Sequence, residues 1–309
     1  MAASTGPYVQ VQTEKPGYPG HVDEFVGDAR YPAVKQIAMD DGIVLFEEQD
    51  VVRGFLAPMP HLGPAEYKPT VKLTAMHPRP LDLQQFMCAA MGAPVAATSV
   101  FTMTEPPPSF KIVGASGDSK FQIATGMGVE ELSFKFNGGI LEMDASLVGL
   151  TCVDAADPTI TPVLDTAAPF RKGDMTLTWL SSTAVTEDFD WKITSGIEAI
   201  NAFVSGTLWP DTLQYANGAL PTVSGTIGKQ SMVAADIAAL AAGTPFSVTI
   251  ALTRASMGVS LVLPACQLVG VERDPIAAER RRAGRYMWEA RYPAAGGAYA
   301  TATYDVTPA

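Results

Sequence analysis

Alternating apolar and polar residues run through much of the chain, and the clearest example lies at residues 120–150. Leu132, Phe134 and Phe136 alternate with polar residues, and a second alternating run follows a Gly-Gly pair. Successive side chains of a β-strand point to opposite faces, and a two-glycine turn between two such runs predicts a β-hairpin. One face would carry these three residues with Leu141, Met143, Ala145 and Leu147, and the other Ser133, Lys135, Glu142, Asp144 and Ser146.

The same period of two predicts strands elsewhere, at residues 42–49, 69–76, 110–114, 175–179, 189–193, 246–252, 259–271, 286–292 and 299–306. Residues 81–91 (LDLQQFMCAAM) predict a helix instead, because Gly92 follows them and Pro94 stands just beyond. A further hairpin is predicted around Gly296 and Gly297, between the last two strands. Many short strands with one helix in each half predict a mainly β protein, a sandwich or a barrel.

Composition shifts divide the chain into four parts. Residues 1–35 mix Gly, Pro, Tyr and charge without a period, which predicts an N-terminal arm. Residues 36–150 form a first β unit. Residues 151–170 carry three prolines and no period, which predicts a linker, and residues 171–309 form a second β unit.

The two β units echo each other. The tripeptide PTV stands at residues 69–71 and at 221–223, and each copy leads to a helix-like segment that ends in Gly-x-Pro. Each continues with a strand that opens on Phe (Phe110, Phe246), a long strand and a final strand. This order favours two copies of one unit. The alternative is one large sheet protein in which ordinary helix-stop chemistry produces the echo.

Charge sets limits on the partners. The chain has 32 acidic and 21 basic residues and a net charge of −11, so nucleic acid should be repelled from most of its surface. Residues 272–291 are the exception, with six arginines against four acids, a local charge of +2 that leaves −13 on the rest. The cluster Arg280, Arg281, Arg282 and Arg285 could bind phosphate, or it could contact carboxylates of a neighbouring copy, which we favour in an acidic protein that assembles with itself.

Cysteine usage and hydropathy bear on the compartment. Cys88, Cys152 and Cys266 are odd in number and lack paired spacing, which argues against a disulfide framework and for a reducing cytoplasm. The N-terminus lacks the basic start and apolar core of a signal peptide, and no run reaches the ~18 apolar residues of a spanning helix. We therefore expect neither secretion by that route nor insertion into a membrane.

No catalytic constellation emerges. His21, His61 and His77 stand among Pro and Gly without metal-ligand spacing, and neither Gly126-x-Gly128 nor residues 225–229 complete a nucleotide-binding motif. Adjacent acids such as Glu130 and Glu131 point to opposite faces of a strand and cannot converge on one substrate. We expect no enzymatic activity, no metal and no cofactor.

An ordered set of segments resembles the tail tube (major tail) proteins of long-tailed bacteriophages: the helix at residues 81–91, FQIATGMGVEELSFKFNGGILEMDASLVGL (121–150), PTVSGTIGKQ (221–230), SVTIALT (247–253) and LVLPACQLVGVERDP (261–275). The resemblance spans residues 36–275 and depends on the order of these segments. It implies tandem β-sandwich or barrel units, each with one flanking helix, that assemble into stacked rings around a channel for DNA. The location implied is the virion tail, after synthesis in the host cytoplasm.

The resemblance also implies partners and surfaces. A single tube unit fits into either half of this chain, so three chains would complete a ring of six-fold appearance; six chains per ring is the alternative. Other tail proteins would bind at the tube ends, and DNA would be non-specific cargo. We expect the acid excess on the channel wall, with the candidates Glu130, Glu131, Glu142 and Asp144, and contacts between subunits at the arginine cluster. The competing hypothesis is a carbohydrate- or host-binding β-sandwich of a tail tip or adhesin.

Overall fold

The computed structural model describes residues 8–13, 32–45, 64–93, 97–100, 107–115, 121–155, 167–179, 182–183, 188–201, 208–216, 222–229, 238, 241–254, 257–273, 284–294 and 296–305. It confirms the mainly β fold class. The first half contains β1 (Tyr8–Thr13), β2 (Gln36–Asp40), β3 (Ile43–Leu45), β4 (Pro64–Tyr67), β5 (Thr70–Met76), α1 (Pro80–Ala90), β6 (Thr98–Val100), β7 (Phe110–Ala115), β8 (Phe121–Asn137), β9 (Ile140–Val148) and β10 (Thr151–Ala155).

In the part of the chain that the structure describes, the second half consists of strands, a single-turn 3-10 helix and α-helical residues at positions 238, 241 and 242. Its elements are η1 (Lys172–Asp174), β11 (Met175–Trp179), β12 (Ser182–Thr183), β13 (Asp188–Thr194), β14 (Ile197–Ile200), β15 (Thr212–Tyr215), β16 (Thr222–Lys229), β17 (Phe246–Arg254), β18 (Met257–Arg273), β19 (Gly284–Ala290) and β20 (Thr301–Asp305). The helix expected in this half lies mostly outside the described residues. No helix within the described ranges has the length and hydropathy to cross a membrane.

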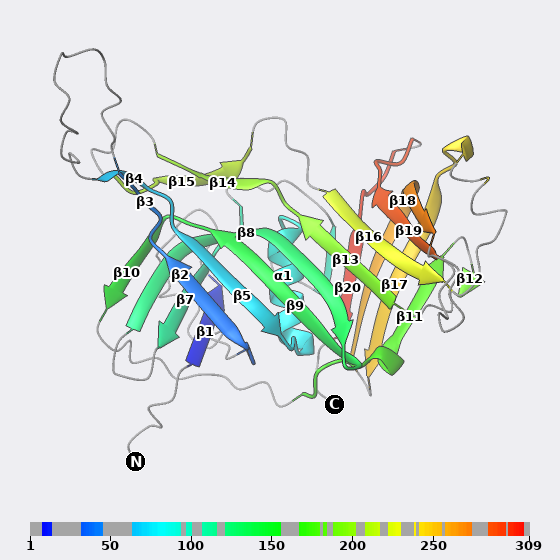
Figure 1. Ribbon diagram of the computed structural model, residues 1–309, viewed down its shortest axis with the longest axis horizontal. Helices are drawn as coiled ribbons and strands as arrows, with labels where there is room; N and C mark the ends of the chain where they lie inside the picture. Colours follow the sequence, from blue (N-terminus) through cyan, green and yellow to red (C-terminus); the bar gives the residue numbers. More distant parts are fainter. Residues whose placement is uncertain are drawn as a thin grey trace, which may run out of the picture.

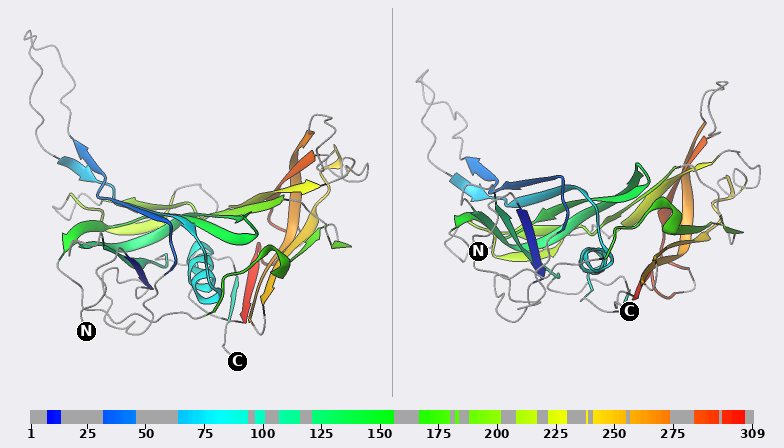
Figure 2. Two further views of the ribbon diagram at one scale, coloured as in Figure 1. Left: turned by 60° about the horizontal axis from the view of Figure 1, so that its bottom comes forward. Right: turned by 90° about the horizontal axis from the view of Figure 1, so that it is seen from below.

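One large antiparallel sheet crosses both halves of the chain (Figure 1). Its strand order is β12-β11-β17-β18-β19-β16-β13-β8-β9-β5-β2, with β1, β6, β7, β10 and β20 attached off this path. The sheet is strongly curved, and α1 lies on one side of it (Figure 2). Twist and curvature of this size are expected of a sheet of many strands.

Two unusually long strands, β8 and β18, organise the sheet. Each has 17 residues and takes different partners along its two parts. The N-terminal part of β8 pairs with β7 and β10, and its C-terminal part pairs with β9 and β13. The N-terminal part of β18 pairs with β17 and β20, and its C-terminal part pairs with β19. Each long strand therefore joins two groups of strands.

The order of pairings in the first half recurs in the second. Where β8 pairs with β7, β9 and β10, β18 pairs with β17, β19 and β20. β5 lies between β2 and β9 as β16 lies between β13 and β19, and β7 and β17 each take a further strand, β1 and β11. The small sheets β3–β4 and β14–β15 occupy matching places in the chain order.

Register irregularities fall at matching positions as well. The β8–β9 ladder shifts at Glu130, and the β18–β19 ladder shifts at Val269. The β7–β8 and β17–β18 ladders both shift just after a first pair that contains Phe110 or Phe246. When the two halves are aligned through these ladders, Thr70 of β5 corresponds to Ser224 of β16. The PTV tripeptides instead align Thr70 with Thr222, two residues earlier. An equal order of pairing with equal bulges is what a repeated unit would produce.

The core lies between the sheet layers and under α1. Phe86 of α1 packs on Phe110 of β7 with ring centroids 5.1 Å apart, and Phe134 stacks on Trp191 at 4.6 Å. These residues are at most 3% exposed, which for side chains of this size removes much apolar surface from water. The core cluster is continuous from the first half to the second.

The central hairpin and the first helix confirm the sequence predictions. β8 and β9 pair around Gly138 and Gly139, both with positive φ, and their ladder places Phe134 opposite Met143. Helix α1 begins with Pro80 at its first turn and ends before Gly92, whose φ of 70° is the left-handed conformation that glycine tolerates.

Three predictions about the segments around these elements are wrong. The prediction of an arm fails for β1, because Val9 and Val11 are buried and pair the strand with β7. The prediction of a linker fails for β10, which pairs with β8. The prediction of a hairpin around Gly296 and Gly297 fails because β19 and β20 do not pair with each other; both lie along β18, which is long enough to hold one after the other.

Candidate functional site

The surface with the strongest chemical character is the side of the large sheet that faces away from the core. Because side chains alternate along a strand, burial of Phe189, Trp191 and Ile193 leaves the other residues of β13 on the opposite side. We call this side the polar face and define it by the corresponding residues of β8, β9, β13, β16 and β19: Glu131, Ser133, Lys135, Glu142, Asp144, Ser146, Asp188, Asp190, Lys192, Thr194, Thr222, Ser224, Thr226, Arg285, Met287 and Glu289.

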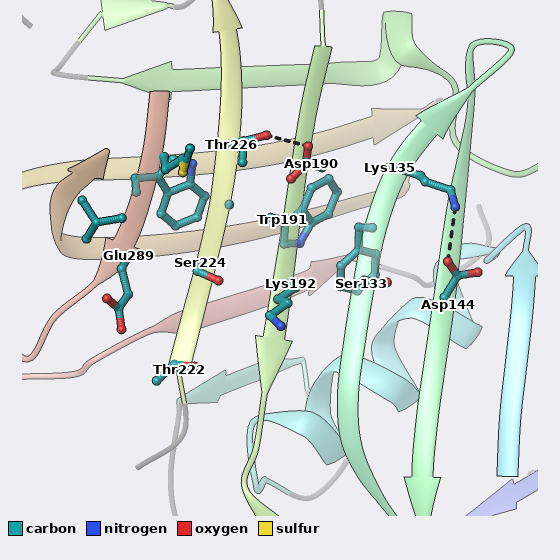
Figure 3. A pocket seen from close by; sticks show the side chains of 15 residues that line it. Ser133, Lys135, Asp144, Asp190, Trp191, Lys192, Thr222, Ser224, Thr226 and Glu289 are labelled. Carbon is teal, nitrogen blue, oxygen red and sulfur yellow. Dashed lines mark hydrogen bonds and ion pairs between the residues drawn. The ribbon is translucent and has the colours of Figure 1, made fainter. Parts of the chain in front are cut away.

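A hollow of about 630 Å³ lies on the polar face, where the sheet curves from the first half into the second. Figure 3 shows its lining on neighbouring strands, with Lys135 and Asp144 from the first half and Asp190, Ser224 and Glu289 from the second. The exposed Val269, at the bulge of β18, lies at its margin. The hollow is thus lined by hydroxyl, amine and carboxylate groups from both halves, and also by apolar groups of Phe134, Trp191, Val269, Met287 and Trp288.

Ion pairs cross the polar face from strand to strand. Lys192 Nζ lies 2.9 Å from Glu131 Oε2 and links the two halves, and Lys135 Nζ lies 3.3 Å from Asp144 Oδ2. The Thr226 hydroxyl donates to Asp190 Oδ2 at 2.5 Å. The lysine side chains of both ion pairs are about half exposed, so each pair contributes little, on the order of 0–1 kcal/mol. Their effect is to fix side-chain positions across adjacent strands.

The four candidate acids differ in exposure. Glu142 lies on the expected side of the hairpin, but its expected exposure is wrong: it is only 8% exposed, because Asn137 Nδ2 donates to it at 3.0 Å and Lys135 lies 3.9 Å away. Asp144 is partly exposed and also accepts the Ala75 backbone N–H at 2.6 Å.

The other two acids stand at a bulge. Glu130 is exposed where the β8–β9 ladder shifts, and its backbone carbonyl accepts from the Ser195 N–H at 2.9 Å. Glu131 points to the polar face and is paired with Lys192. The extra residue of the bulge therefore separates these two neighbours in sequence.

The arginine cluster is described in part. Arg280, Arg281 and Arg282 lie outside the described residues. Arg285 of β19 places a guanidinium N–H group 3.1 Å from Asp188 Oδ2 in the same chain. Contact between this cluster and another copy stays a prediction.

The polar face carries six acids and three bases, a formal excess of three negative charges. Alternation in the hairpin predicts the acids of β8 and β9, whereas the acids of β13 and β19 are not among the predicted site residues. A signal was present, because Phe189, Trp191 and Ile193 already fix which residues of β13 point away from the core.

Gly225, which belongs to the incomplete phosphate-loop pattern at residues 225–229, has a packing role. A Cβ on Gly225 would lie 2.6 Å from Trp288 Cζ2 and 2.4 Å from the Asp190 carbonyl oxygen, so the residue makes room for the indole in the core. No group of three or more His, Cys, Asp or Glu side chains gathers as metal ligands within the described ranges. In comparisons with known proteins, no family model and no curated protein match the chain.

Proposed function

We propose that this chain is a structural protein that assembles with itself into stacked rings and so forms the hollow tail tube of a long-tailed bacteriophage. The observation that carries the proposal is the polar face, a continuous sheet surface built from both halves of one chain. A surface of this kind suits a channel wall, because the strands supply many parallel rows of short polar side chains on a rigid support.

The charge of the polar face supports the same proposal. A wall that carries more acids than bases repels phosphate groups, so it keeps DNA from adhering while DNA moves past. Salt screens this repulsion over about 10 Å. Asp144, Asp190 and Glu289 would act on the passing polyanion more directly than Glu142, which is buried.

The ring we propose contains three chains. The recurrence of strand pairings gives each chain two similar halves, so three chains would present six similar sectors around a channel. Other tail proteins would bind at the ends of the tube. Six chains per ring, with one half of each chain outside the wall, is the alternative arrangement.

Electron microscopy of the purified protein tests this function. We expect tubes or rings, and top views whose mass corresponds to three chains with two kinds of alternating lobe. Six chains per ring would contradict the trimer but leave the tube intact. Monomers that persist at high protein concentration would contradict the tube itself.

A carbohydrate- or host-binding module is the second candidate, and the hollow on the polar face favours it because it offers hydroxyl and charged groups to a polar ligand. The aromatic rings nearest the hollow, Trp191 and Trp288, are buried in the core and offer no stacking platform. Binding of glycans by monomers, lost on Ser224→Trp in the hollow, would support this candidate over the tube.

A further inference from the structure

The contact between the two halves of the chain is a strand pairing that we call the intrachain joint. It joins residues 190–194 of β13 to residues 131–135 of β8, antiparallel, with Lys192 opposite Ser133. Two features stabilise it: the stack of Trp191 on Phe134 and the ion pair between Lys192 and Glu131. Each half contributes one edge to this joint.

The recurrence of pairings assigns the same two roles to two strands that have no such partner within the described ranges. β2 corresponds to β13. β2 pairs with β5, which lies beside β9, and β13 pairs with β16, which lies beside β19. The C-terminal part of β18 corresponds to that of β8. Among the described residues, β2 pairs with β5 alone, and residues 267–273 pair with β19 alone.

Both open edges leave part of the core accessible. Ile37 and Met39 of β2 and Val271 of β18 are partly buried apolar residues at the margin of the core cluster. Their counterparts at the closed edges, Phe189 and Trp191 of β13 and Leu132 of β8, are at most 4% exposed. An unpaired strand with an apolar margin is a template for another strand.

We infer that residues 39–42 of one copy, at the C-terminal end of β2 and just beyond it, pair with residues 270–273 of β18 in a second copy, in the register of the intrachain joint. The ladders that relate the halves place Asp40 where Lys192 stands and Glu272 where Ser133 stands, so Asp40 of one copy lies opposite Glu272 of the next. This contact between copies deepens the proposed function, because it names the surface through which a ring would close. It is a head-to-tail contact, since two different edges meet.

The two joints differ in charge. Lys192 and Glu131 attract each other in the intrachain joint, whereas Asp40 and Glu272 are both acidic and would meet in the joint between copies. Three other charged residues lie beside them. Lys72 of β5 lies opposite Ala38, and Asp41 follows Asp40 in the chain. Arg285 of β19 lies opposite Glu272 and is paired with Asp188. The joint between copies therefore lacks the attraction that the intrachain joint has at this position.

Disulfide trapping tests the register. Residues directly opposite in an antiparallel pair have Cα atoms about 4.5–5.5 Å apart, within the range of about 4.4–6.8 Å that a disulfide spans. We expect a chain with Asp40→Cys, mixed with a chain with Glu272→Cys and mildly oxidised, to give a covalent dimer. Either chain alone should give none, because the contact is head-to-tail. The natural cysteines Cys88, Cys152 and Cys266 are buried, which keeps the background low. Asp305→Cys, an exposed change on β20, is the control partner.

The outcomes separate the joint from the function. Tubes without a 40–272 disulfide would overturn the joint and leave the tube standing. The disulfide without rings or tubes would support the joint and overturn the tube. Absence of both would overturn both proposals.

A charge reversal gives a second readout at the same position. Asp40→Lys places a lysine where Lys192 stands in the intrachain joint, opposite Glu272, so the protein concentration needed for assembly should fall about two- to fivefold, the range expected for an exposed charge pair. Asp305→Lys makes the same change in net charge away from both edges and should shift the threshold less. An unchanged or higher threshold for Asp40→Lys relative to this control would overturn the register.

Discussion

In the first half of the chain Val71 of β5 lies opposite Leu147 of β9, and in the second half Gly225 of β16 lies opposite Trp288 of β19. The recurring pairings make these two pairs equivalent. The first half places two medium-sized side chains at this site. The second half places tryptophan, the largest side chain, opposite glycine, which has no side chain. Volume at this site is therefore shared across the two strands, so that a larger side chain on one strand requires a smaller one on its neighbour.

The edges of the two halves differ in a second way. β13 of the second half is covered on both sides, by β16 and β8, whereas its counterpart β2 is covered by β5 alone in the described part of the sheet. Accordingly Trp191 of β13 is 3% exposed, and Met39 at the matching place in β2 is partly exposed. A large aromatic residue stands at the closed edge and a smaller, flexible one at the open edge.

The largest expected effect separates these two edges. Trp191→Ala should lower the free energy of unfolding by about 3–5 kcal/mol, because it removes the buried stack on Phe134. Met39→Ala should cost about 1 kcal/mol in the unassembled chain, because less of its surface is removed from water. Urea denaturation of the monomer measures both losses. Equal losses would show that the β2 edge is as closed as the β13 edge.

The next effect concerns the glycine beneath the indole. Gly225→Ala should lower stability by about 1–3 kcal/mol, since the added Cβ collides with Trp288 and with the Asp190 carbonyl. Trp288→Leu in the same chain should recover only the part caused by the ring, because the carbonyl remains. Gly173→Ala is the control, since nothing lies within 4 Å of a Cβ there. A double-mutant cycle on thermal or urea unfolding gives the coupling, and additive losses would contradict the shared volume.

Alkaline conditions should weaken both halves. Burial raises the pKa of the Cys152 thiol in the first half to about 11, and it raises that of Cys266 in the second half to about 12. The unfolded chain loses these protons near pH 9 and the folded chain keeps them, so stability is full below about pH 9 and falls from there toward pH 12. Near pH 10 each thiol should cost about 1 kcal/mol.

Thiol labelling during the pH titration separates the two cysteines. Cys152 should react with a thiol reagent at a lower pH than Cys266. Cys→Ala variants at each site supply the controls, and each should flatten the alkaline loss of stability. Reaction of both thiols at pH 8 in the folded protein would contradict the effect of burial.

The smallest effect lies at the ion pair that crosses between the halves. Glu131→Gln and Lys192→Met, combined in a double-mutant cycle, should give a coupling of about 0.2–1 kcal/mol, because both side chains are more than one-third exposed. The coupling should shrink as salt is added. A coupling of several kcal/mol that ignores salt would mean that the pair is shielded from solvent.

The hairpin of the first half could be predicted from the sequence because alternation is local. Leu132 and Phe134 indicate which face of the strand is apolar, and Gly138 and Gly139 predict the turn. The pairing of β13 with β8 could not be predicted, since nothing in either strand specifies a partner about 60 residues away. The pairing of β20 with β18 could not be predicted for the same reason, because the proximity of β19 and β20 in the sequence says nothing about the length of β18.

The candidate site could be predicted in part. The side of the hairpin that carries Glu142 and Asp144 followed from alternation, but the burial of Glu142 depends on Asn137 across the turn. The hollow depends on the curvature of the sheet and on strands from both halves, and no local pattern encodes either.

The length of β8 has a mechanical consequence. One uninterrupted backbone of 17 residues belongs to the pairings with β7 and β10 at one end and to those with β9 and β13 at the other. A load along this strand would act on its hydrogen bonds in shear, many at once, instead of opening them one by one. Because both groups of strands are bonded to the same backbone, a displacement of one group would strain the other. Force applied at one end of β8 would therefore be shared between the two groups.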